Sequence, residues 1–108
     1  SNLESEKIGQ INFYSNNMGE TDFGEVQKLV RKITSTSNNV AAIGCSKEEK
    51  GTIILASSSS LKVNCGSILK EVLSSIGGSG GGKKTYAQGA CPVSKLSSAL
   101  SKIKDSIS

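Results

Sequence analysis

The residues with the clearest chemical potential lie between Gly77 and Lys84, where five glycines are followed by two lysines. Glycine lacks a Cβ atom, so its backbone amides can approach a phosphate closely, and Lys83 and Lys84 would add positive charge beside them. A glycine run costs conformational entropy unless bare backbone is needed there. The segment is therefore interpreted as a binding site for a phosphodiester group. A flexible linker is the alternative, although apolar helix patterns lie on both sides of the segment.

The same segment nearly matches the nucleotide-binding P-loop, because Gly77, Gly82 and Lys83 stand in register with that motif. Lys84, however, occupies the position of the Ser or Thr that would ligate magnesium. A P-loop also joins a strand to a helix, whereas this segment follows a helix pattern and precedes a strand pattern. The departures disfavour a nucleotidase.

Other catalytic chemistry finds little support. The chain has no histidine, and so lacks the usual general base, the imidazole metal ligand and any Ser-His-Asp or Cys-His arrangement. Glu48 and Glu49 are adjacent on a predicted turn, where they cannot flank a substrate. Cys45, Cys65 and Cys91 are widely spaced, which disfavours a zinc site or a disulfide framework. The apolar strand pattern around Cys45 favours a buried thiol there, and nothing near Cys65 or Cys91 indicates a nucleophile. We predict no catalytic residue, no metal site and no cofactor in this chain.

Length and charge set further bounds. The 108 residues fit one domain, and we assign residues 1–10 to a linker or cloning remnant and residues 11–108 to the domain. Residues 51–108 carry seven lysines against only Glu71 and Asp105, which is compatible with a nucleic-acid partner. Neither an apolar run of about 18 residues nor a charged leader is present, so we expect a soluble, cytoplasmic protein without membrane contact.

The elements that would position the glycine segment follow from apolar periodicity, with Asp22 and Asn64 as helix caps. Lys28, Arg31 and Lys32 lie on the outer side of the first helix, where a solvated face is the default interpretation and a partner surface the alternative. The predicted fold is α+β, in layers: a small mixed sheet with flanking helices. In order, we expect a strand at 8–14, a polar turn at 15–22, a helix at 23–33, a hairpin of strands at 40–45 and 52–56, a helix at 65–76, the glycine loop at 77–84, a strand at 86–91 and a helix at 92–107.

Residues 77–90, GGSGGGKKTYAQGA, together with the preceding SILKEVLSSI and the amphipathic helix that follows, resemble the end of bacterial-type alanyl-tRNA synthetases. The pattern there is close to Gly-Gly-x-Gly-Gly-Gly-Arg-x-Asp-x-Ala-Gln-Gly-Gly. This chain departs from it at Lys83, Thr85 and Ala90, and lysine keeps the charge of arginine but loses its bidentate geometry. The resemblance covers about residues 11–108 and identifies a DHH-associated domain. The matching residues are Gly77, Gly78, Gly80, Gly81, Gly82, Ala87, Gln88 and Gly89.

The resemblance implies an RNA-binding appendage that contacts tRNA(Ala), supports aminoacylation and editing, and adjoins other domains of a parent synthetase. ATP and metal would belong to those absent domains. In this picture the glycines shape the loop, Lys83 and Lys84 pair with phosphate, Gln88 hydrogen-bonds sugar or base edges, and Tyr86 either stacks on a base or fills core. The implied nucleic-acid-binding residues are Gly78, Gly80, Gly81, Gly82, Lys83, Lys84, Tyr86 and Gln88.

Two alternatives belong to other classes. The DHH-associated family also includes the substrate-binding domains of DHH phosphoesterases and exonucleases, whose glycines typically run into histidine where this chain has Lys83. The second alternative is a protein-protein module that docks to the parent enzyme or forms a homodimer.

Overall fold

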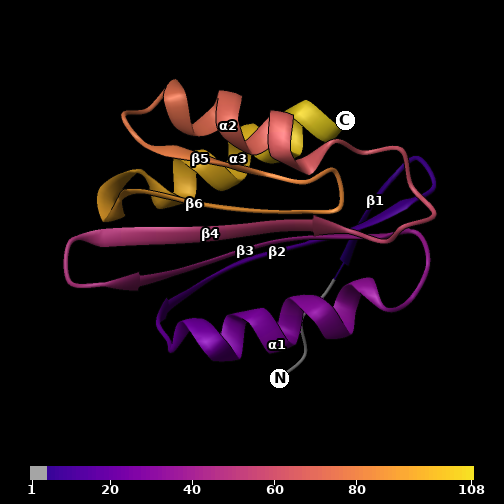
Figure 1. Ribbon diagram of the computed structural model, residues 1–108, viewed down its shortest axis with the longest axis horizontal. Coiled ribbons are helices and arrows are strands. Elements are labelled where there is room, and N and C mark those ends of the chain that lie inside the picture. The colour runs from indigo at the N-terminus through magenta and orange to yellow at the C-terminus, as the bar shows by residue number, and fades with distance from the viewer. Residues whose placement is uncertain (1–4) are drawn as a thin grey trace.

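The computed structural model describes residues 5–108, which form a six-stranded mixed sheet flanked by helices (Figure 1). The predicted α+β class is confirmed. The strands are β1 (Ser5–Ile8), β2 (Ile11–Glu20), β3 (Asn39–Lys47), β4 (Lys50–Ser57), β5 (Ser79–Gly82) and β6 (Tyr86–Pro92). The helices are α1 (Phe23–Thr34), α2 (Cys65–Ser74), the short 3-10 helix η1 (Val93–Lys95) and α3 (Leu96–Ile107).

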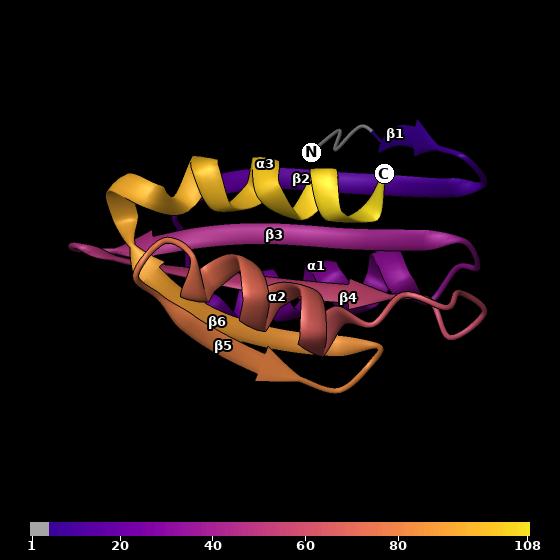
Figure 2. The same cartoon turned by 90° about the horizontal axis from the view of Figure 1, so that it is seen from above.

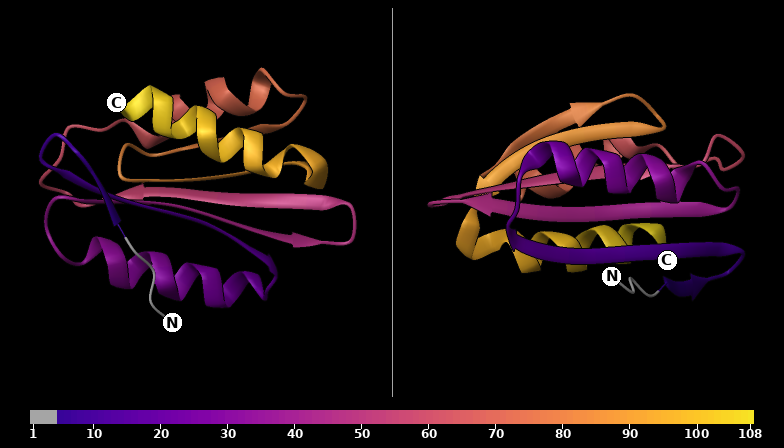
Figure 3. Two further views of the ribbon diagram at one scale, coloured as in Figure 1. Left: turned by 180° about the vertical axis from the view of Figure 1, so that it is seen from behind. Right: turned by 90° about the horizontal axis from the view of Figure 1, so that it is seen from below.

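The order of strands across the sheet is β1-β2-β3-β4-β6-β5. β2 and β3 run parallel because α1 connects them as a crossover, and every other neighbouring pair is antiparallel. α1 covers one face of the sheet, while α2 and α3 lie side by side on the other (Figures 1 and 2). The view from behind shows the same three layers, and the view from below shows α1 in front of the sheet (Figure 3). The centre of the sheet is thus buried from both sides.

Each face of the sheet has its own apolar core. β3 and β4 supply residues to both cores in alternation, which explains why VAAIGC and TIILA read as continuous apolar runs. The core under α1 is built from Val26, Val30, Ala41, Ile43, Cys45, Ile54 and Ala56. The larger core under α2 and α3 includes Phe13, Ile53, Leu55, Leu69, Leu73, Leu96 and Ile103.

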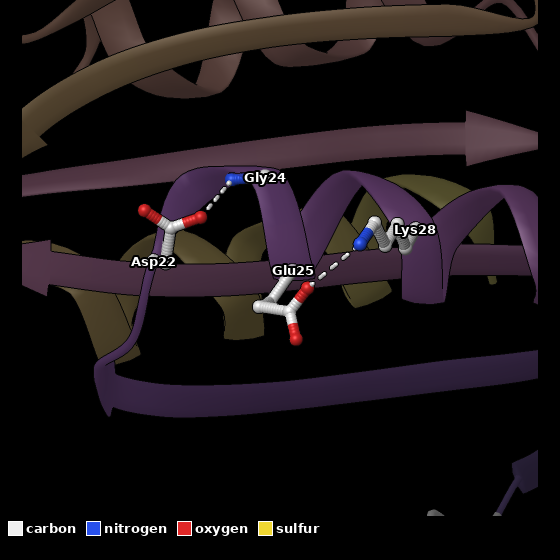
Figure 4. A network of polar contacts seen from close by, with 4 residues as sticks. All are labelled: Asp22, Gly24, Glu25 and Lys28. Atoms are coloured by element: carbon white, nitrogen blue, oxygen red, sulfur yellow. Dashed lines mark hydrogen bonds and ion pairs between the residues drawn. The ribbon is translucent and has the colours of Figure 1, made fainter.

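The two predicted helix caps are confirmed. The Asp22 carboxylate accepts a hydrogen bond of 3.1 Å from the Gly24 backbone N–H (Figure 4). At the start of α2, the Asn64 side-chain oxygen accepts one of 3.2 Å from the Ser67 backbone N–H. Each cap satisfies a backbone donor that the first turn of its helix leaves without a partner.

Figure 4 also shows an ion pair on α1. Lys28 Nζ lies 3.4 Å from Glu25 Oε2, and both side chains are largely exposed. An exposed pair at this i,i+3 spacing contributes about 0.2–0.5 kcal/mol to helix stability. Its greater consequence is that the Lys28 charge is locally balanced.

The polar segment after Tyr14 is strand and not the predicted turn, so that prediction is wrong from residue 15 to residue 20. The main chain there pairs with β3 up to Asn17 opposite Gly44 and resumes after a bulge at Glu20 opposite Ser46. Most side chains in this half of β2 are exposed or half-buried. The strand is therefore stabilised by its backbone partner, and its side chains carry no apolar alternation that a sequence pattern can detect.

The two ends of the chain also differ from expectation. Residues 5–8, inside the predicted linker or cloning remnant, form β1 against β2, and Glu6 there pairs with Lys104 of α3 at 2.5 Å. Residues 1–4 lie outside the described residues. At the other end, the predicted helix from residue 92 begins as η1 at Val93, and α3 proper starts at Leu96. The Val93 backbone N–H donates to the Glu49 carbonyl oxygen at 2.9 Å and fixes this start beside the β3–β4 turn.

Candidate nucleic-acid interface

The glycine segment, predicted as a loop, is largely a strand. Ser79–Gly82 forms β5, which pairs antiparallel with β6 at the edge of the sheet. Only Gly77 and Gly78 before it and Lys83 to Thr85 after it are irregular. Gly77 has a φ of 85°, the left-handed region that glycine adopts more readily than other residues. A residue in this conformation just after a helix turns the chain away from the helix axis, here after α2.

Close packing explains most of the glycines. A Cβ atom built on Gly80 would lie 2.8 Å from Leu73 Cδ1 and 2.9 Å from the Gly89 Cα. One on Gly82 would lie 2.6 Å from the Tyr86 carbonyl oxygen. Gly66 at the start of α2 leaves no room either, because a Cβ there would overlap the Gly82 carbonyl oxygen. The glycines therefore let α2 lie directly against the β5–β6 hairpin.

This packing places the lysines beside the start of α2. Asn64, Gly66, Ser67 and Lys70 line one side of an open pocket of about 620 Å³, and residues 80–84 line the other. We call this the lysine pocket. Its lining holds Lys70, Lys83 and Lys84 and no acidic side chain, and all three lysines are exposed. Positive charge on three side chains in one concavity favours an anion.

The start of α2 adds its dipole to the pocket but few free donors. Cys65 N donates to the Lys84 carbonyl oxygen at 2.8 Å and Gly66 N to the Lys83 carbonyl oxygen at 3.0 Å. Ser67 N is bonded by the Asn64 cap. The first-turn amides are thus occupied, so an anion here would be held by ammonium groups in the positive field of the helix terminus.

The outer edge of β5 offers additional main-chain groups. Lys83 N donates to the Tyr86 carbonyl oxygen at 2.8 Å and closes the β5–β6 turn. Because hydrogen-bonded and non-hydrogen-bonded pairs alternate along an antiparallel ladder, Gly80 and Gly82 direct their main-chain groups away from β6. Both residues line the lysine pocket.

The structure brings together five of the eight predicted site residues and separates the other three. Gly80, Gly81, Gly82, Lys83 and Lys84 line the lysine pocket. The other three lie elsewhere, as alternation along β6 and the bend after α2 dictate.

Gly78 lines a different depression beside Cys91 and Pro92. Tyr86 packs against the core under α1, on the face of the sheet opposite α2, and its hydroxyl donates to Gln88 Oε1 at 3.4 Å. Gln88 points to the same face and lines a cleft with Asp22 and Lys50. Tyr86 is thus partly buried against the core under α1.

Sequence reasoning missed Lys70, Asn64 and Ser67 as pocket residues. Asn64 was recognised only as a cap, and Lys70 stood on the polar side of a predicted helix without a stated role. The signal that could have found them is Gly66, since a glycine in the first turn of a helix indicates a close neighbour. That neighbour is the β5–β6 turn.

The cysteines contribute no chemistry to this site. Cys45, Cys65 and Cys91 are all buried and free, which confirms the buried thiol predicted for Cys45. Burial raises the pKa of each thiol above its ordinary value of 9.0, which keeps it protonated and unreactive at neutral pH. Within residues 5–108, three or more His, Cys, Asp or Glu side chains do not cluster in a way that could hold a metal. None of the described helices is long and apolar enough to cross a membrane.

Comparison with known proteins identifies the family of this chain. The family model of the DHHA1 domain matches residues 10–108. The chain is 33% identical over 90 residues to the alanine–tRNA ligase of Orientia tsutsugamushi strain Ikeda, covering 81% of this chain and 10% of that protein. It is 34% identical over 89 residues to the alanine–tRNA ligase of Methanoregula boonei, covering 71% and 10%. The chain thus spans about a tenth of the length of these relatives.

Two solved structures share the fold. The C-Ala domain from Aquifex aeolicus alanyl-tRNA synthetase superposes with a TM-score of 0.84 at 23% identity, covering 97% of both chains. A pGpG-specific phosphodiesterase of Vibrio, PggH, gives 0.53 at 11% identity, covering 96% of this chain and 35% of that one. The family model and the C-Ala fold agree with the pattern of residues 77–90, and the chain belongs to the DHHA1 domain family.

Proposed function

We propose that this chain is the C-terminal C-Ala domain of an alanine–tRNA ligase and that it binds tRNA(Ala) through the lysine pocket. The observation that carries the proposal is the pocket itself, where Lys70, Lys83 and Lys84 meet without an acidic neighbour in the lining. The curated relatives named alanine–tRNA ligase and the C-Ala fold support the parentage.

Binding would rest on phosphate contacts. Lysine is a flexible point charge, so Lys70, Lys83 and Lys84 suit phosphates of an RNA backbone without fixing its sequence. Gly80 and Gly82 allow that backbone to approach the edge of β5, where their main-chain N–H groups point away from β6. If three phosphates are neutralised, affinity should fall roughly 20- to 40-fold between 50 and 200 mM salt.

Within a parent ligase, the domain would hold tRNA while other domains aminoacylate and edit it. The domain supplies no nucleophile or general base, so its contribution is to position the substrate. ATP and any catalytic metal would bind those other domains, which would also be its protein partners. A cytoplasmic location fits this role.

The alternative, a substrate-binding domain of a DHH phosphoesterase, has weaker support. The phosphodiesterase superposes with a TM-score of 0.53, against 0.84 for the C-Ala domain, and at 11% identity it is evidence for the fold alone. Lys83 also replaces the histidine typical of that branch.

The test is fluorescence anisotropy of labelled tRNA(Ala) titrated with the chain and with Lys83→Gln/Lys84→Gln. Loss of two phosphate contacts should weaken binding about tenfold and lower the salt slope by about 1–2. A matched control is Lys47→Gln/Lys95→Gln, which removes the same charge from two exposed lysines outside the pocket. Equal affinity for all three proteins would refute the lysine pocket as the tRNA site.

A further inference from the structure

Three long stretches of this chain contain basic residues and no acidic residue. No acidic residue stands between Glu25 and Glu48, between Glu49 and Glu71, or between Glu71 and Asp105. The end of α1, the connection from β4 to α2, and the β5–β6 turn all fall within these intervals. Where the fold brings these three segments together, it also gathers their positive charges.

Hydrogen bonds join the three segments at one end of the molecule. Ser57 N at the end of β4 donates to the Thr85 carbonyl oxygen in the β5–β6 turn at 3.0 Å. The next residue, Ser58, donates from its hydroxyl to the Thr36 carbonyl oxygen after α1. Asn38 N donates to Ser60 Oγ at 3.3 Å. Figure 1 shows the end of α1, the β4–α2 connection and the β5–β6 turn at the same end of the long axis.

Six basic side chains occupy this end, and we call them the basic end: Arg31, Lys32, Lys62, Lys70, Lys83 and Lys84. All six residues are exposed. The ion pairs found among residues 5–108 involve other lysines, Lys28 with Glu25 and Lys104 with Glu6. The charge of the basic end is therefore available to a ligand.

Four of the nine acidic residues lie at the opposite end. Glu48 and Glu49 form the β3–β4 turn, while Glu20 and Asp22 line one cleft with Lys47 where β2 meets α1. Lys47 and Lys50 offset part of the negative charge there, whereas in the basic end Glu71, which follows Lys70 on α2, stands among six basic residues. An electric asymmetry of this kind orients a polyanion toward one end of the molecule.

We infer that the basic end is one continuous contact surface for the ribose-phosphate backbone of RNA, extending the lysine pocket across the β4–α2 connection to the last turn of α1. The inference rests on the proposed function, because it takes the same RNA as its ligand. It assigns phosphate contacts to Arg31, Lys32 and Lys62, which belong to no part of the lysine pocket. Exposed Ser59, Ser60 and Asn64 lie between the charges and can donate to phosphate or sugar oxygens.

The salt dependence of binding distinguishes contact through the lysine pocket alone from contact through the whole basic end. Three phosphate contacts, the lysine pocket alone, predict a slope of log affinity against log salt of about −2 to −3. Six contacts predict about −4 to −5. The decisive variant is Arg31→Gln/Lys32→Gln, because glutamine preserves helix propensity in α1 while removing both charges. Lys62→Gln is a second variant that leaves every helix untouched.

The experiment measures tRNA affinity by anisotropy at several salt concentrations, with circular dichroism melting to confirm that each variant is folded. Arg31→Gln/Lys32→Gln should weaken binding about tenfold and reduce the slope by about 1–2, and Lys62→Gln should reduce it by about 1. The control Lys47→Gln/Lys95→Gln lies at the other end, where η1 and the β3–β4 turn are bonded through Val93 N and the Glu49 carbonyl oxygen.

The outcomes separate this inference from the proposed function. If the Arg31/Lys32 and Lys62 variants match the control while Lys83→Gln/Lys84→Gln weakens binding, the extended surface is wrong and the lysine pocket stands. If the unmodified chain binds no tRNA at low salt, both are overturned. A slope near −2 for the unmodified chain also contradicts the extended surface.

Discussion

At the scale of single residues, glycine in this domain serves packing more than it serves flexibility. Gly89 lies in β6 with its Cα facing the neighbouring β5 and the side chain of Leu73. An added Cβ would lie 2.6 Å from the Ser79 carbonyl oxygen and 2.7 Å from the Gly80 Cα. Both of these are backbone atoms, so rotation of a side chain cannot relieve the overlap. The packing of α2 against β5 and β6 thus requires these glycines, whether or not a ligand binds.

Gly89→Ala should therefore destabilise the domain by about 1–3 kcal/mol, the usual effect of overpacking a tight contact. Propensity alone predicts the opposite, since alanine normally stabilises a strand relative to glycine by about 0.5–1 kcal/mol. Thermal melting by circular dichroism measures the change, with Ser79→Ala, an exposed position on β5, as the matched control. An unchanged or raised melting temperature for Gly89→Ala would refute the packing account.

The lysines are a second case at this scale. Lys83 and Lys84 could be singled out from the sequence because they follow a glycine run. Lys70 could not, because its approach to them depends on α2 lying against the β5–β6 hairpin. Tyr86 and Gln88 were drawn into the predicted site by sequence proximity, but strand alternation directs them to the face under α1.

At the scale of elements, the sequence predicts what side-chain periodicity encodes. α1, α2, α3 and the β3–β4 hairpin carry apolar patterns of the right period, and all four were predicted in the right order. β5 has no side-chain pattern because three of its residues are glycine. The second half of β2 is polar, and both strands exist because a neighbouring backbone pairs with them.

The contribution of the Asp22 cap to the stability of α1 can be measured by substitution. Asp22→Ala removes the acceptor for Gly24 N and should lower the free energy of unfolding by about 1 kcal/mol. For a domain of this size the melting temperature should fall by about 4–8 °C. Asp22→Asn keeps an acceptor oxygen and should retain most of the stability. Equal losses in both variants would indicate that charge, and not capping, is the contribution of Asp22.

At the scale of the whole molecule, the fold converts separated charges in the sequence into two chemically different ends. The sequence revealed a basic second half, and its lysines supplied the hypothesis of a nucleic-acid partner. It could not reveal that Arg31 and Lys32, from the balanced first half, lie at the same end as Lys83 and Lys84. That placement depends on the hydrogen bonds that join the end of α1 to the β4–α2 connection. Of the two interpretations considered for α1, the solvated face fits Lys28, which pairs with Glu25, and the partner surface is the one we infer for Arg31 and Lys32.

The most direct test of the central claim is an NMR titration of the ¹⁵N-labelled chain with tRNA(Ala), following every assigned backbone amide. The account predicts chemical-shift changes or line broadening at residues 31–38, 58–67 and 80–86, with residues 46–51 and 93–96 unaffected. Changes centred on the β3–β4 turn, or no change at low salt with tRNA in excess, would contradict it.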